Sequence, residues 1–205
     1  FRSDTLKLPI MATFTDEFMI TETEILNPVS ANIKWTELPN TQTYEVTLRD
    51  APNNRTCDLM FSGYAEGSAY NKAISIYNGT GKPIDLKYYS LRKQSNGTGE
   101  LKLDYPLSGT LANNECYVIV SSRANETLKA MANHVVPSPL DEDNILNFNG
   151  NDAIGLYHNG ILIDVIGEVN NSADWGKDMS LKRNASTISP NKDFNWNEWN
   201  KLSKD

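Results

Sequence analysis

The chain has 205 residues, a net charge of −7, a pI near 4.9 and 39% hydrophobic residues. This composition can form a packed core, whereas the acidic charge argues against a nucleic-acid-binding protein, which needs a basic surface. No apolar run approaches the roughly 20 residues of a membrane-spanning helix, since the best runs, 117–120 and 161–165, have the length of strands. The first residues lack the apolar core of a signal peptide, so we expect a processed chain or an excerpt from a longer protein.

Alternating apolar residues predict a β-hairpin over residues 31–48. Ile33 and Trp35 share one face of a first strand, and Tyr44 begins the alternation of a second. The pair is similar to the middle strands of a fibronectin type III domain, over about a third of such a domain. We therefore expect residues 1–53 to form the end of an upstream β-domain or an extension packed on the next one.

Residues 58–91 predict three short strands with two loops. Phe61 faces one side of the first strand and Tyr64 the other, because side chains alternate along a strand. A second strand covers 73–77, and the sequence NGTGKP at 78–83 is a reverse turn before the alternation resumes.

Two further elements are predicted downstream. Asn125 is a candidate helix cap, and Leu128, Met131, Ala132 and Val135 would share the core-facing side of a short helix. A hairpin is predicted around 158–160, because Asn-Gly supplies the positive φ angles of a tight turn.

The stretch GSAYNKAISIYNGTGKPIDLKYYSL resembles the opening of the lamin-tail domain, an immunoglobulin-like module of nuclear lamins and of many bacterial secreted proteins. The resemblance spans roughly residues 57–200 and continues in order through the segments 107–111, 116–120, 148–156, 163–167, 175–183 and Glu198-Trp199. Bacterial members often carry acidic residues where this chain has Gly63 and Ser75, so any ligand or metal held by those carboxylates is in doubt here. No heptad run is present, so the resemblance implies no filament.

The two cysteines, Cys57 and Cys116, are interpreted as buried thiols rather than as a disulfide, and the absence of a CxxC pair excludes the common zinc frameworks. The acidic run at 141–144 fails the EF-hand pattern, so a solvated loop is preferred to a calcium site.

Candidate catalytic groups are few. His134 would stand at a helix end, and His158 beside a turn is interpreted as a solvated loop residue rather than a ligand or base. No nucleophile elbow, paired metal-binding histidines or phosphate-binding loop occurs. Four carboxylates could be paired for acid–base chemistry, but each is expected to have a structural role: Glu66, Asp85, Asp152 and Asp164. Asp152 is predicted to accept hydrogen bonds from its own loop, and Asp164 to face solvent or satisfy a buried turn.

Aromatic residues near the C-terminus allow two interpretations. Trp196 beside Asn amides could form a platform for sugar stacking. Trp175 and Trp199 are instead expected to pack over the end of the sandwich, as their position in the family implies.

These observations predict an all-β protein, an immunoglobulin-like β-sandwich of the lamin-tail type with one short helix, preceded by an N-terminal β-hairpin segment. The expected domains are 1–53 and 54–205. The resemblance implies a non-catalytic binding or anchoring module, of adhesion type, in a secreted or cell-surface bacterial protein, which binds a protein or glycan through loops at the sandwich ends. The alternatives are a carbohydrate-binding module, a DNA-binding appendage of a secreted nuclease, and an enzyme that uses the scattered carboxylates. No catalytic, cofactor or metal residue is assigned.

Overall fold

A computed structural model of the chain describes residues 20–27, 30–35, 56–137 and 144–204. The chain divides into two compact units, residues 1–53 and 54–205.

The first unit contains an antiparallel hairpin. Strand β1 (Ile20–Asn27) pairs with β2 (Ser30–Trp35), with Thr23 opposite Ile33. The first strand of the hairpin predicted over residues 31–48 therefore lies in β2. It pairs with β1, which precedes it in the chain. The second strand predicted in the hairpin, which begins at Tyr44, lies outside the described residues.

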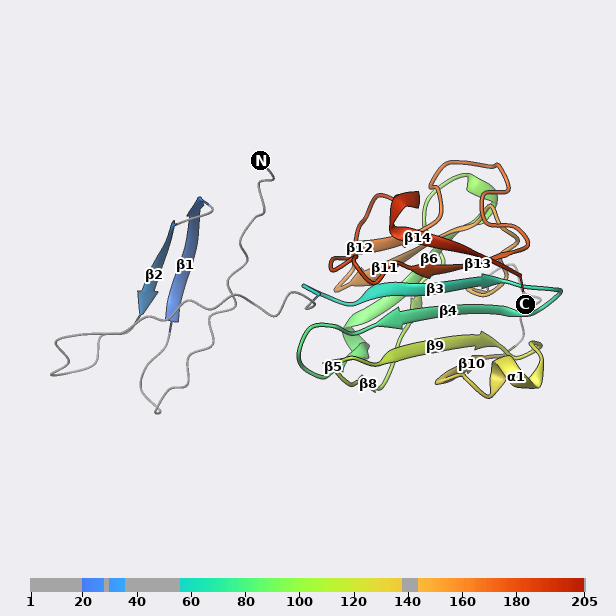
Figure 1. Ribbon diagram of the computed structural model, residues 1–205, viewed down its shortest axis with the longest axis horizontal. Coiled ribbons are helices and arrows are strands. Elements are labelled where there is room, and N and C mark those ends of the chain that lie inside the picture. Colours follow the sequence, from blue (N-terminus) through green and yellow to red (C-terminus); the bar gives the residue numbers. More distant parts are fainter. Residues whose placement is uncertain (1–19, 28–29, 36–55, 138–143, 205) are drawn as a thin grey trace, which may run out of the picture. The chain divides into compact units, whose positions relative to one another are not determined.

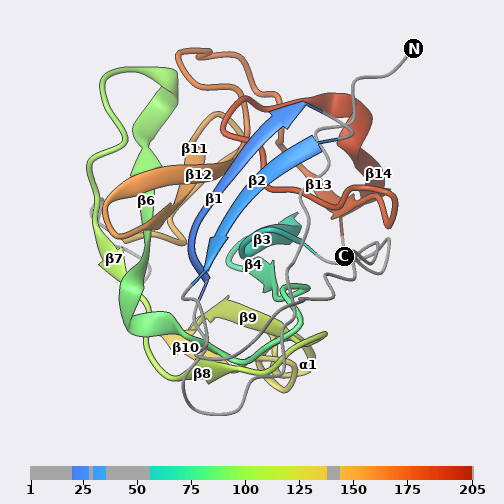
Figure 2. The ribbon, with the colours of Figure 1, turned by 90° about the vertical axis from the view of Figure 1, so that its left-hand side faces the viewer.

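The second unit is a β-sandwich, and its two main sheets are visible in Figures 1 and 2. The larger sheet has the strand order β10-β9-β4-β3-β13-β14, and the smaller has the order β12-β11-β6-β7. The larger sheet consists of β3 (Met60–Glu66), β4 (Lys72–Tyr77), β9 (Cys116–Ser121), β10 (His134–Val136), β13 (Met179–Arg183) and β14 (Trp199–Ser203). The smaller consists of β6 (Tyr89–Gln94), β7 (Tyr105–Pro106), β11 (Ala153–His158) and β12 (Ile161–Ile166). The antiparallel pair β5 (Ile84–Asp85) and β8 (Thr110–Leu111) lies apart from both sheets, as do four helical turns: η1 (Leu86–Tyr88), η2 (Ser95–Gly97), α1 (Glu126–Lys129) and η3 (Trp196–Glu198).

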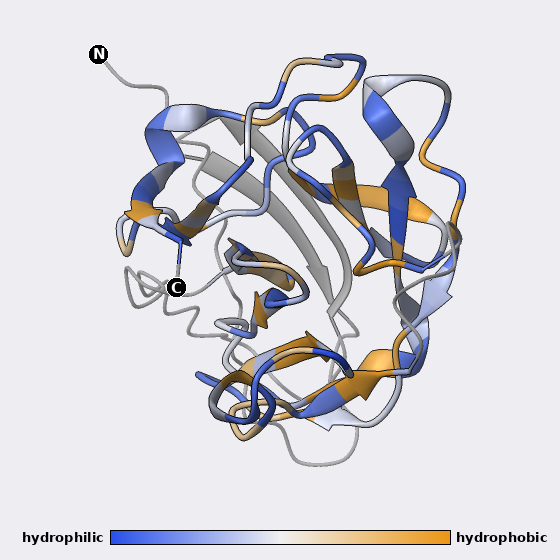
Figure 3. Cartoon of the chain, turned by 90° about the vertical axis from the view of Figure 1, so that its right-hand side faces the viewer, coloured by the Kyte–Doolittle hydropathy of each residue, from blue (hydrophilic) through white to orange (hydrophobic). Residues whose placement is uncertain are grey.

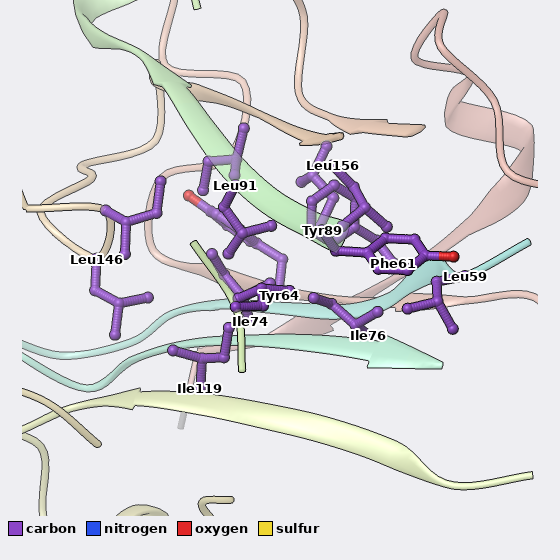
Figure 4. Packing of buried hydrophobic residues seen from close by; sticks show 14 of the residues in the cluster. Leu59, Phe61, Tyr64, Ile74, Ile76, Tyr89, Leu91, Ile119, Leu146 and Leu156 are labelled. Atoms are coloured by element: carbon purple, nitrogen blue, oxygen red, sulfur yellow. The ribbon is translucent and has the colours of Figure 1, made fainter. Parts of the chain in front are cut away.

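The hydrophobic core lies between the two sheets. Phe61 and Ile76 of the larger sheet and Leu91 and Leu156 of the smaller are each 0% exposed and belong to one cluster (Figure 4). Burying an aliphatic or aromatic side chain of this size contributes about 1.5–3 kcal/mol each. The predicted all-β, immunoglobulin-like sandwich is confirmed.

The predicted orientation of the Tyr64 side chain in β3 is wrong, and a β-bulge explains the difference. The register between β3 and β4 shifts between Phe61 and Gly63. The extra residue reverses the alternation, so Tyr64 points to the same side as Phe61 and is only 2% exposed. Tyr64 stacks on Phe148, with ring centroids 4.8 Å apart. The sequence pattern alone placed this tyrosine on the opposite face.

The hairpin around 158–160 is confirmed. β11 and β12 are antiparallel neighbours, with His158 opposite Ile161. Asn159 and Gly160 have φ angles of 49° and 78°, the left-handed values that a primed turn requires.

The predicted helix is shorter than the sequence pattern indicated. Asn125 caps it as expected by accepting a hydrogen bond from the amide of Leu128, 2.8 Å away, but α1 ends at Lys129. Met131 is therefore 65% exposed, and Val135 lies in β10, which pairs in parallel with β9. Strand pairing at the sheet edge replaces the second helical turn. Among the described residues, no helix is long and apolar enough to cross a membrane.

The interpretation of the cysteines as buried thiols is wrong. Cys57 and Cys116 are both exposed and both free. Cys57 precedes β3 and Cys116 opens β9, so neither side chain reaches the space between the sheets.

Candidate functional site

Two adjoining polar pockets lie at the end of the sandwich where β3, β6 and β9 finish. Their volumes are about 470 and 200 Å³. The larger is lined by Lys93, Ser95, Thr98, Gly99, Glu100, Lys102, Leu103 and Asp104, and the smaller by Lys93, Ser95, Asn96, Asn147, Asn149 and Asp152. Because they share Lys93 and Ser95, we call them together the polar groove. Figure 3 views this end of the molecule, where the loops are largely hydrophilic.

Lys93 reaches the groove from within β6. It stands two residues after Leu91 and therefore shares the inward face of the strand. Its ammonium group donates to the backbone carbonyls of Asn144 (2.9 Å) and Asn147 (2.7 Å). The side chain is 4% exposed, so these bonds replace the water that the charge loses on burial.

Asp152 holds the opposite wall. One carboxylate oxygen accepts from the amide of Asn149 (2.8 Å), as predicted, and the other accepts from the amide of Asn96 (2.7 Å). The second bond joins the loop that follows β6 to the loop that precedes β11. Behind this wall, burial, and then the charge of Asp152, raises the pKa of Tyr64.

The loop after β6 is fixed in place. The side chain of Gln94 is fully buried, donates to Gly99 O and Asn170 Oδ1, and accepts from the amide of Asn170 (2.7 Å). Gly97 has a φ of 62°, and a Cβ at this position would overlap the backbone of Asn171. A loop constrained in this way gives the groove a preformed shape, which lowers the entropic cost of binding.

The four candidate carboxylates do not converge on one site. Glu66 is buried against Lys72, Asp85 accepts from the amide of Lys87 (3.1 Å), and Asp164 pairs with Arg183. Of the four, Asp152 is in the groove. Asp164 does not face solvent: it is 0% exposed and accepts from the amides of Phe61 (2.7 Å) and Asn191 (2.8 Å).

The prediction that His158 is a solvated loop residue is wrong. His158 takes part in a contact at the other end of the sandwich. Its Nδ1 donates to Asp58 (2.8 Å), and its ring stacks on Tyr89 with centroids 4.3 Å apart. Asp58 also accepts from the Tyr89 hydroxyl (2.6 Å) and from the amide of Leu59 (2.7 Å). The β11–β12 turn is thereby tied to the segment that enters β3. His134 lies in β10 and hydrogen-bonds the hydroxyl of Tyr105 (2.6 Å).

Replacing Asp58 by asparagine is expected to lower the free energy of unfolding at pH 7 by about 1.5–3 kcal/mol, since its bonds are charge-assisted. Burial, and then the Asp58 carboxylate, raises the pKa of Tyr89 above its usual range. Stability is therefore lost as the pH rises above about 10, where the Tyr89 hydroxyl ionises in the unfolded chain and not in the folded one. Urea unfolding of both proteins at pH 7 checks the prediction, and equal free energies of unfolding contradict this account.

Trp196 is a poor platform for stacking. Its indole N–H donates to Glu168 (2.7 Å), and the ammonium of Lys201 lies 4.0 Å from the ring centroid. Its edge packs on Phe194 and Trp175. Trp175 and Trp199 are each 6% exposed and join the main core, which confirms the expectation for both.

The positions of the two missing acidic residues lie opposite each other. Gly63 of β3 pairs with Ser75 of β4, so carboxylates at these positions would be neighbours in a relative. The acidic residues 141–143 lie outside the described part of the chain, and Asn144 is buried. Within the part that the structure describes, no three histidine, cysteine or acidic side chains are close enough to hold a metal ion together.

Taken together, the two packed sheets and the fixed loops at their ends define an immunoglobulin-like domain that presents a polar groove. Residues 52–170 match the model of one family, the Lamin Tail Domain. The match covers more than half of the chain, and the chain therefore belongs to this family of immunoglobulin-like, non-catalytic domains. Strands β13 and β14 follow the matched segment and complete the larger sheet. No curated protein and no solved structure matches the chain.

Sequence reasoning assigned no groove residue to a binding site. Of the residues that line the groove, only Asp152 is among the candidates for chemistry that the sequence offers. A usable signal was Lys93, a charged residue in phase with Tyr89 and Leu91 on the buried face of β6. Buried lysines are rare unless they are paired, so such a position indicates a polar site beneath it.

Proposed function

We propose that the chain is a non-catalytic, adhesion-type binding module of a secreted or cell-surface bacterial protein, and that it binds its partner through the polar groove. The observation that carries this proposal is the groove itself. Its volume of about 470 Å³ in the larger pocket lies within the usual range for ligand sites, about 300–1,000 Å³.

The arrangement of charged groups supports binding rather than catalysis. Asp152 and Lys93 each bind two backbone groups of the groove walls, Asp104 pairs with Arg92, and neither histidine lines the groove. A pH-dependent hydrolytic activity that is abolished in Asp152→Asn would favour the enzyme instead.

The acidic charge does not support the nuclease-appendage alternative. A net charge of −7 opposes the phosphate backbone of DNA, and affinity for it would have to fall steeply with salt. We therefore place the partner among uncharged or mixed-charge surface components, either glycan or protein.

Replacing Lys102 by glutamate is expected to weaken binding to bacterial cells at least tenfold, about 1.4 kcal/mol, because Lys102 is exposed in the larger pocket. Fluorescently labelled chain 1–205 is incubated with a panel of intact bacteria, and bound protein is measured by flow cytometry and sedimentation.

The matched control is Lys182→Glu, which makes the same change of charge at an exposed position of β13 outside the groove. It should bind as the unmodified chain does. Equal loss in both variants, or no binding of the unmodified chain to any cells, would contradict the proposed function.

A further inference from the structure

We propose that the polar groove binds the end of a neutral, polyhydroxylated chain, which is the chemistry of a neutral glycan. This inference rests on the proposed binding function and names the class of ligand. It concerns the groove and not the aromatic residues near the C-terminus.

The charges in the smaller pocket select against an ionic ligand. Lys93 and Asp152 both line this pocket of about 200 Å³, and each is 4% exposed. An anion placed there faces the carboxylate of Asp152, and a cation faces the ammonium of Lys93. Like charges at short range in a partly dehydrated site are strongly unfavourable, so a neutral ligand meets the lower cost.

The pocket also has hydrogen-bonding groups available to a ligand. Each oxygen of Asp152 accepts one backbone amide, whereas an ionised carboxylate has about four acceptor positions. Among the described residues, the hydroxyl of Ser95 and the side-chain amides of Asn96 and Asn149 make no hydrogen bond, although all three line the pocket.

These groups match hydroxyl groups in particular. The amides and the Ser95 hydroxyl both donate and accept hydrogen bonds, and so does each hydroxyl of a sugar. The spare acceptor positions of Asp152 take hydroxyl protons in short, charge-assisted bonds. A ligand without hydrogen-bond donors would displace water from the buried Asp152 carboxylate and leave its acceptor positions unfilled. The free-energy cost of such an unsatisfied group exceeds the net gain from an ordinary hydrogen bond.

The larger pocket extends the site along the loop after β6. Thr98, Glu100 and Lys102 are exposed along it, and they offer donors and acceptors to a second sugar unit. Leu103 is the apolar side chain among the lining residues that the structure describes, and none of these residues offers an aromatic ring for stacking. Recognition therefore depends on hydrogen bonds with a preformed surface, which gives selectivity with modest affinity.

The test uses the whole chain and a panel of soluble oligosaccharides observed by saturation-transfer NMR and titration calorimetry. Neutral probes contain glucose, mannose, galactose or N-acetylglucosamine, and anionic probes contain uronic acids or sulfated sugars. We expect at least one neutral probe to bind and the anionic probes to bind at least tenfold more weakly.

The decisive variant is Ser95→Ala/Asn149→Ala, which changes two exposed side chains and leaves the fixed walls intact. Its affinity for the neutral probe should fall at least tenfold. The matched control, Asn200→Ala/Ser203→Ala, removes the same two groups from exposed positions of β14 and should bind normally. Binding that is lost in Trp196→Ala but kept in the groove variant would overturn the proposal, as would a preference for anionic probes or no binding to any neutral probe.

These outcomes are distinct from failure of the proposed function. If Lys102→Glu weakens cell binding but no neutral probe competes with the cells, the proposed binding function stands and the proposal of a neutral glycan ligand is wrong. If the unmodified chain binds no cells, the proposed binding function is itself wrong.

Discussion

Replacing Arg183 by leucine is expected to lower the free energy of unfolding at neutral pH by about 3–5 kcal/mol. The guanidinium group is 2% exposed and joins three acceptors: the carboxylates of Asp164 and Glu198, and the carbonyl of Phe61. Asp164 is 0% exposed. Removing its cationic partner leaves a buried charge that no solvent can reach, and this accounts for the large effect.

The loss should grow as the pH rises. Burial raises the pKa of Asp164, while Arg183 acts in the opposite direction, so the variant has a higher pKa still. A carboxyl with a raised pKa in the folded state favours folding at low pH, where it is protonated, and opposes folding above that pKa. The deficit in Arg183→Leu is therefore smallest near pH 4 and increases toward pH 8.

Urea unfolding across this pH range checks the prediction, with Lys182→Leu as its control. Lys182 is the exposed neighbour of Arg183 on β13, and its replacement should change the free energy of unfolding by about 0.5 kcal/mol or less. A deficit that is the same at every pH would show that Arg183 acts through packing alone.

Replacing Gly150 by alanine is expected to cost about 3 kcal/mol or more. Gly150 has a φ of 101°, and a Cβ there would overlap the backbone of Lys177. Its carbonyl accepts from the amide of Gly176 (2.8 Å), so the two loops cannot separate without losing this bond. The substitution should also disturb Asp152, two residues away, and with it the groove.

Gly160→Ala separates the cost of the left-handed backbone conformation from the cost of the overlap with Lys177. Gly160 also has a positive φ, 78°, but no atom lies within 4 Å of the position that a Cβ would take. This variant should lose about 1–2 kcal/mol, the cost of the left-handed conformation alone. Chemical denaturation of both variants gives the difference, and equal losses would rule out the contact with Lys177 as the cause.

Local pattern predicted much of the fold. Alternation identified β4, apolar runs of strand length identified β9 and β12, and the Asn-Gly pair identified the turn between β11 and β12, because these signals act over a few residues. The failures arose where a neighbouring strand altered the local preference. A bulge against β4 turned Tyr64 into the core, and pairing with β9 converted the end of a predicted helix into β10.

The candidate site was much less predictable. Lys93 and Asp152 are 59 positions apart in the sequence, and the loop after β6 meets the one before β11 only because these strands are antiparallel neighbours. Asp58 and His158 are separated by 100 residues. No local pattern contains such contacts, since they result from the pairing of distant strands.

By itself, the sequence determined the class of this protein, several of its strands and turns and part of its core, because periodicity and turn chemistry are properties of short segments. Only the tertiary structure decided which charged groups are buried in pairs, which face the polar groove and which tie one loop to another. The physical reason is that burial and partnership depend on distances between segments that are remote in the chain.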